Sequence, residues 1–255
     1  MEFELSGLDL ILFAVAGVGT GIINTLAGSG SLITLPVFVF LCGLPAPVAN
    51  GTNRIGVMVQ SAVGLFGLTR SGVVDFRGSA WVVLPAILGA ALGSRIAVSL
   101  DEAAMNYALG GLMVFMLIVL LVNPKRWLIE VSQEMAGLRR WVAVVAFFGI
   151  GVYGGFIQAG VGIFLLAGLV LIGRYTLSSA NGIKLLVVAA YGLPTLAIFF
   201  MQGQVHLLYG LAMAVFQSAG AWIAVKFVVR VPNADIWIHR LLIVIVATSA
   251  LLFFV

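Results

Sequence analysis

The chain consists largely of long apolar segments separated by short polar connections, and this pattern constrains its fold more than any other feature. Ten such segments cover most of the 255 residues. Eight of them have about the 20 residues that a helix needs to cross a hydrocarbon core roughly 30 Å thick. A mean hydropathy of +1.21 and a charged fraction of 9% also lie outside the range of soluble globular domains. We therefore expect an all-α integral membrane protein.

Two of the ten segments are too short to cross a membrane. If helical, residues 32–42 and 163–172 measure about 17 and 15 Å. Each is predicted to be the returning arm of a hairpin whose tip lies within the membrane, which gives roughly 8 to 10 membrane segments. The predicted segments are Leu8 to Leu26, Leu32 to Cys42, Val48 to Leu68, Ala80 to Leu100, Ala103 to Val122, Trp141 to Ile157, Ile163 to Ile172, Leu177 to Met201, Leu207 to Val229 and Ile236 to Val255.

Glycines recur at a fixed spacing, which indicates an internal repeat. We interpret residues 1–122 and 141–255 as two transmembrane repeats, joined by a cytoplasmic linker over residues 123–140. Each repeat is predicted to contain a broken helical hairpin plus three transmembrane helices. A shift of 132 residues aligns Gly17, Gly19, Gly28 and Gly30 with Gly149, Gly151, Gly160 and Gly162, and a shift of 131 aligns Ala49-Asn50-Gly51 with Ala180-Asn181-Gly182.

Positively charged residues gather on one predicted side of the membrane, as they do on the cytoplasmic side of membrane proteins. With the N-terminus outside, ten of the 13 Lys and Arg residues fall inside and only Arg95 falls outside. An odd number of crossings per repeat then makes the second repeat inverted relative to the first. Many secondary transporters share this plan and place their binding site near the midplane, where helices break.

The two remaining cations, Arg54 and Lys184, lie inside predicted membrane segments at nearly matching repeat positions. An ionised side chain there is costly and usually marks a pathway or a partner. All nine Asp and Glu residues fall at segment ends or in loops, whereas a proton or sodium pump usually has an acid inside the membrane. We expect Arg54 and Lys184 to hold a small anion near the membrane centre. The alternative is that both side chains snorkel to the interface.

Two glycine turns, Gly28-Ser29-Gly30 and Gly160-Val161-Gly162, are predicted to reverse the chain within the membrane, because glycine tolerates strained backbone. Backbone N–H groups at the helix starts that follow suit an oxyanion such as sulfite, a sulfonate or phosphate. Close helix packing is the alternative role for these glycines. The predicted substrate-binding residues are Gly28, Ser29, Gly30, Ser31, Asn50, Thr52, Asn53, Arg54, Gln158, Gly160, Gly162, Asn181 and Lys184.

Asp75 and His206 align in the repeat, and a gating or proton-sensitive role is conceivable for both. No pattern predicts a cofactor, and Cys42, as the single cysteine, excludes a Cys-based zinc site. Although the net charge is +4, the basic residues form no basic aromatic face, which excludes a nucleic-acid partner. The expected partners are a small anionic substrate and the lipid bilayer, and a homodimer is left open.

Several of these features together resemble the TauE/SafE family of sulfite exporters over essentially the whole chain. The shared features are the repeated glycine turn followed by Pro36, the stretch Ala49 to Asn53, the loop Gly72 to Asp75, and Ala180 to Lys184. The resemblance implies a multi-pass transporter of the bacterial inner membrane that exports sulfite, organosulfonates or related anions. Ser31 and Ile163 stand where many members have a further glycine, so the particular anion is left open.

Three functional hypotheses follow, of which an alternating-access anion transporter is preferred. A passive anion channel of the same architecture is an alternative that no sequence feature separates from it. An intramembrane hydrolase, with Ser29 or Ser31 as nucleophile and His206 as base, is a weak match because His206 is expected near the opposite surface. We therefore do not expect an enzyme.

Overall fold

The computed structural model describes residues 6–70, 76, 79–122, 137–226 and 234–253. Within these ranges the chain contains helices and no strand, which confirms the all-α prediction. The first half consists of α1 (Gly7–Ala27), α2 (Ser31–Pro36), a π-helix (Val37–Leu41), α3 (Ala46–Arg70), α4 (Ala80–Val98) and α5 (Glu102–Val122). The second consists of α6 (Gly137–Ile157), α7 (Val161–Ala167), a π-helix (Gly168–Ile172), α8 (Leu177–Met201), α9 (Leu207–Lys226) and α10 (Ala234–Leu252).

Most helix ends lie within a few residues of the predicted segment ends, and local chemistry explains several of them. Ser6 caps α1 through a reciprocal pair of hydrogen bonds with Asp9, which satisfies backbone N–H groups of the first turn. Thr176 caps α8 in the same position. Pro47 is accommodated in the first turn of α3, where a missing N–H leaves no bond unmade. Helix α6 begins at Gly137, inside the range predicted as linker, and residues 123–136 lie outside the described residues.

Among the described helices, α1, α4, α5, α8 and α9 are each long and apolar enough to cross a membrane. The segments 31–41 and 161–172 are shorter, as the sequence predicted. Large apolar side chains such as Leu88, Ile118 and Leu211 are exposed along these helices, whereas polar side chains such as Arg54 and Gln217 are fully buried. Apolar exterior and polar interior together fit a multi-pass membrane protein.

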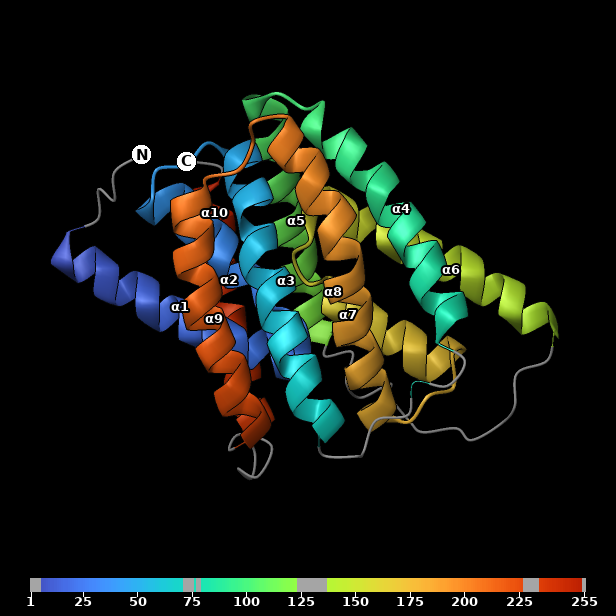
Figure 1. The fold of residues 1–255 in the computed structure, drawn as a ribbon. Helices are drawn as coiled ribbons and strands as arrows, with labels where there is room; N and C mark the ends of the chain where they lie inside the picture. The colour runs from blue at the N-terminus through green and yellow to red at the C-terminus, as the bar shows by residue number, and fades with distance from the viewer. Residues whose placement is uncertain (1–5, 71–75, 77–78, 123–136, 227–233, 254–255) are drawn as a thin grey trace.

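The most extensive helix contacts follow a pattern that is unchanged when the two halves are exchanged. Helix α9 packs on α1, and its counterpart α4 packs on α6. Helix α3 contacts α9, and its counterpart α8 contacts α4, while α3 and α8 pack on each other and α5 packs on α10. Figure 1 shows α3 and α8 running through the middle of the molecule. This correspondence between the contacts of the two halves fits the predicted repeat. The opposite orientation of the two copies stays a prediction.

Candidate functional site

Both glycine turns adopt the left-handed backbone that the sequence predicted. Gly28 has φ 75° and ends α1, and Gly160 has φ 71° and precedes α7. The Gly28 N–H donates to the carbonyl oxygens of Ile23 and Asn24, a C-terminal cap that is typical of glycine. Helices α1 and α6 therefore both end inside the protein, and a short helix follows each of them.

The two turns touch each other through their backbones. The Gly162 N–H donates to the Gly28 carbonyl oxygen at 3.0 Å. A Cβ atom added to Gly28 would lie 2.4 Å from Gly162 Cα, and one added to Gly162 would lie 2.3 Å from Gly28 Cα. The Gly30 N–H donates to Asn24 Oδ1 at 3.4 Å. The N–H groups of Gly30 and Gly162, which were expected to face an anion, are therefore bonded within the protein.

Arg54 of α3 reaches across to the end of α6 in the other half. Its guanidinium donates to the carbonyl oxygens of Gly154 at 3.3 Å, Gly155 at 2.6 Å and Phe156 at 3.3 Å. The same group lies 4.3 Å from the centre of the Phe199 ring, a cation–π contact. The side chain is 0% exposed, which excludes the alternative that it snorkels to the interface.

Lys184 of α8 makes the corresponding contact with the end of α1. Its ammonium donates to the carbonyl oxygens of Asn24 at 3.2 Å and Thr25 at 3.0 Å, and to Asn181 Oδ1 at 2.7 Å. The side chain is 1% exposed, so it does not snorkel either. Each cation thus binds the C-terminal carbonyl groups of the helix that precedes the glycine turn of the opposite half. These carbonyl groups carry the partial negative charge of the helix end, and a cation there is stabilising.

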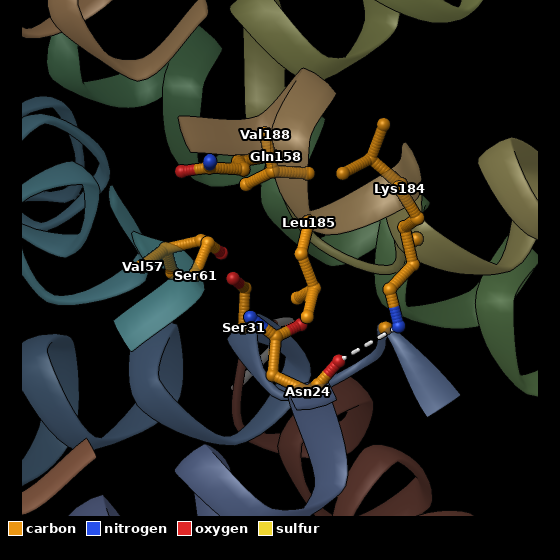
Figure 2. A pocket seen from close by; sticks show the side chains of 11 residues that line it. Asn24, Ser31, Val57, Ser61, Gln158, Lys184, Leu185 and Val188 are labelled. Carbon is orange, nitrogen blue, oxygen red and sulfur yellow. Dashed lines mark hydrogen bonds between the residues drawn. The ribbon is translucent and has the colours of Figure 1, made fainter. Parts of the chain in front are cut away.

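A cavity lies between the glycine turns, on the Lys184 side. Its walls come from α1, α2, α3, α7 and α8 and from the two turns, and Lys184 is the one charged residue among those that line it. Figure 2 shows Asn24, Ser31 and Ser61 pointing toward one another on one side of the cavity, with Lys184 on the other. The lining residues are Asn24, Gly28, Ser31, Val57, Ser61, Gln158, Val161, Gly162, Lys184, Leu185 and Val188.

The cavity is small in this conformation. The centre of a water molecule has about 10 Å³ available to it, which is about the room that one water needs. Its polar groups are hydroxyls, amides and one ammonium, and no carboxylate lines it. The wall therefore offers hydrogen-bond donors and positive charge, which are complementary to an anion.

Several predicted residues lie outside this cavity, and most of them have partners elsewhere in the protein. The Asn50 side-chain amide donates to the Phe156 carbonyl oxygen at 2.8 Å, beside Arg54. Asn53 Oδ1 accepts from the Thr34 hydroxyl at 2.6 Å. The Thr52 hydroxyl accepts from the backbone N–H of His206 at 2.8 Å, and the Ser29 hydroxyl is buried without a hydrogen-bond partner in the described part of the chain. Of the thirteen predicted residues, the structure places Gly28, Ser31, Gln158, Gly162 and Lys184 on this cavity wall.

His206 lies between α8 and α9 and ties this connection to the start of α3 through Thr52. Its Nδ1 accepts from the backbone N–H of Tyr209 at 3.3 Å, as an N-cap side chain does. Burial lowers the pKa of the imidazole. Asp75, its predicted partner in gating, lies outside the described residues.

Two polar residues of the cavity wall, Asn24 and Ser61, were not predicted from the sequence. Both lie inside apolar segments, and both are buried. Asn24 stands four residues before Gly28, whereas the predicted Gln158 stands two residues before Gly160, so the criterion that selected Gln158 did not reach Asn24. Ser61 follows Gln60, whose side-chain amide donates to the Ser61 hydroxyl at 3.1 Å. No local signal separates Ser61 from other buried serines.

Comparison with known proteins supports a membrane transporter. A probable membrane transporter protein of Haemophilus influenzae is 30% identical, with 87% of this chain and 86% of the relative covered. The probable membrane transporter protein YfcA of Escherichia coli (strain K12) is 26% identical over 86% of this chain and 80% of its own length. No solved structure matches. Because the family model described as Sulfite exporter TauE/SafE matches residues 13–253, the chain belongs to that family.

Proposed function

We propose that the protein exports small sulfur-containing anions, such as sulfite or an organosulfonate, across the bacterial inner membrane by alternating access. The observation that carries the proposal is the cavity between the two glycine turns, with an ammonium group and neutral hydrogen-bond donors on its wall. Family membership supports the substrate class, since the family is described as sulfite exporters. The names of the relatives support transport without stating a substrate.

In this proposal the two walls of the cavity have different tasks. Lys184 supplies positive charge, and the hydroxyls of Ser31 and Ser61 and the amide of Asn24 donate hydrogen bonds to the anion oxygens. A sulfite ion needs more room than one water molecule, so we assign this conformation to an occluded state in which the site is contracted. Movement of the α1–α2 turn relative to the α6–α7 turn would open the cavity to one side at a time.

Anion flux into proteoliposomes tests the proposal. We expect Lys184→Met, which keeps most of the side-chain length and removes the charge, to reduce sulfite uptake at low concentration about tenfold or more, because the attraction lost at short range in a protein interior is worth several kcal/mol. The matched control is Lys226→Met. Lys226 is an exposed lysine whose ammonium lies 4.1 Å from the centre of the Trp222 ring, so its variant removes the same charge outside the cavity.

Each outcome separates the candidate functions. Saturable sulfite uptake that falls in Lys184→Met and persists in Lys226→Met is the expected result. Uptake that rises linearly with concentration would instead favour the passive channel. Equal uptake by wild type and a folded Lys184→Met variant would contradict the assignment of the site.

A further inference from the structure

The ends of α1 and α6 present the same electrostatic problem. Each helix stops inside the protein, and the carbonyl groups of its last turn carry partial negative charge. No water of the bulk phase reaches buried groups to compensate them. In transporters with broken helices, the carbonyl groups at such ends commonly coordinate a free sodium ion or a proton.

In this protein a side chain occupies both positions. The Lys184 ammonium has three N–H donors, and three oxygen acceptors lie within 2.7–3.2 Å of its Nζ: the carbonyl groups of Asn24 and Thr25 and the amide oxygen of Asn181. All three oxygens are neutral, and two of them belong to the helix end, whose partial negative charge faces the ammonium. Neutral carbonyl and amide oxygens are also the ligands that proteins offer to a free monovalent cation.

The Arg54 contact repeats the arrangement in the other half with a different cation. Three consecutive carbonyl groups, those of Gly154, Gly155 and Phe156, accept from its guanidinium. Two unlike cations, supplied by each half to the other, are thus placed on equivalent helix ends. The recurrence indicates that a positive charge at each end is a requirement of the fold rather than an accident of one residue.

We propose that Lys184 is a tethered cation that occupies a monovalent cation site at the end of α1, so that the protein needs no free sodium there. Removal of the side chain leaves a cage formed by the oxygens of Asn24, Thr25 and Asn181, which accepts a free sodium or alkylammonium ion. Lys184 is in this respect a positioning residue, since it holds the end of α1 next to the cavity. The part of this inference that concerns transport rests on the proposed function, and the part that concerns cation binding does not.

Thermal unfolding of the purified full chain in detergent tests the cage directly. Lys184→Ala is compared in sodium chloride, methylammonium chloride and choline chloride at equal ionic strength. Sodium or methylammonium at about five times its dissociation constant is expected to raise the Tm of the variant by roughly 2–4 °C over choline, which is too large for the cage. Wild type and Lys226→Ala, which lacks the same charge outside the site, are expected to unfold at one temperature in all three salts.

Two further measurements keep the inference open to refutation. If Lys184→Ala does not fold, Lys184→Met fills most of the same space without charge, and its Tm is expected to fall well below that of Lys226→Met. Wild-type sulfite uptake is expected to be unchanged when choline replaces sodium on both sides of the membrane. A folded Lys184→Ala variant that is indifferent to the salt, a Lys184→Met variant as stable as Lys226→Met, or sodium-dependent wild-type uptake would each overturn the inference. Absence of any sulfite uptake would refute the proposed function and leave the unfolding test valid.

Discussion

The Arg54 and Lys184 sites occupy equivalent places in the two halves but differ in surroundings. Arg54 is fully buried, binds three carbonyl groups and packs on the Phe199 ring, and it does not line the cavity between the turns. Lys184 binds two carbonyl groups and one side-chain amide, and its side chain forms part of the cavity wall. The helix end is neutralised in both halves, whereas only the Lys184 site adjoins this cavity.

The two halves therefore share the need for a cation at the helix end, but they differ in what lies next to that cation. A cation at each helix end binds buried carbonyl groups of the last turn, and leaving such a group unsatisfied costs about 1–3 kcal/mol. Two of these carbonyl groups, those of Asn24 and Phe156, also accept from the Gly28 N–H and from the Asn50 amide. The two glycine turns differ in the residues at corresponding positions. Ser29 and Ser31 of the first turn correspond to Val161 and Ile163 of the second, so hydroxyl groups are concentrated on one side of the molecule.

The largest expected effect concerns the equivalent glycines Gly28 and Gly160. Gly28→Ala places a Cβ atom 2.4 Å from the Gly162 backbone in a left-handed conformation, so both turns would have to separate. We expect a loss of more than about 4 kcal/mol of unfolding free energy, or no folded protein. In Gly160→Ala the nearest atom, at 2.4 Å, is the terminal methyl of Met116, which can rotate away. Its loss is expected near the 1–2 kcal/mol of left-handed strain alone.

Gly43 provides the control for backbone strain. It has φ 62° and open space around its added Cβ, so Gly43→Ala isolates the conformational cost. Thermal unfolding of the three variants is expected to rank them with Gly28→Ala far below the other two, at roughly 2–4 °C per kcal/mol for a chain of this size. If Gly28→Ala were as stable as Gly43→Ala, the contact between the turns would not hold the halves together.

Much of the fold was predictable because the membrane fixes the length and composition of each helix. The short segments 32–42 and 163–172 and the left-handed turns at Gly28 and Gly160 followed from segment length and from glycine. The π-helical form of their ends was not predicted. Pro36 precedes one π-helix and lacks an N–H group, but Ala167 precedes the other, so proline is not the common cause.

The site was predictable only in part. Position along the chain indicated that Arg54 and Lys184 lie within the membrane, and both are buried. It did not indicate which helix end faces each of them, because that depends on how one half packs on the other. The carbonyl groups of Asn24 and Gly155, which are main-chain atoms, carry no residue-specific signal at all. The prediction that both cations contact the same anion stays a prediction.

A smaller effect is expected from the serines that distinguish the first turn from the second. Ser31→Ala removes a hydroxyl from the cavity wall and is expected to raise the KM for sulfite about two- to tenfold, the equivalent of one hydrogen bond. Ser29→Ala removes a buried hydroxyl that has no hydrogen-bond partner among the described residues, so KM is expected to stay unchanged and stability to stay equal or rise. Concentration-dependent uptake into proteoliposomes gives both KM values. Equal changes in the two variants would mean that the cavity does not mark the anion site.

The smallest effect concerns position 206, which aligns with Asp75 of the first half. Burial places the pKa of the His206 imidazole below that of the unfolded chain, about 6.5. As pH falls, the imidazole therefore binds its proton first in the unfolded chain. The contribution of His206 to stability is present above about pH 6.5, and it is lost as pH falls from there toward the lower pKa of the folded protein. His206→Asn keeps an acceptor for the Tyr209 N–H without a titrating group. Between pH 7.5 and 5, the Tm of this variant is expected to fall less than the Tm of wild type, and the difference is expected to be about 1 °C. Because His239 is present in both proteins, the difference between the two pH profiles isolates His206, and identical profiles would show that this end of α3 is held without regard to its protonation.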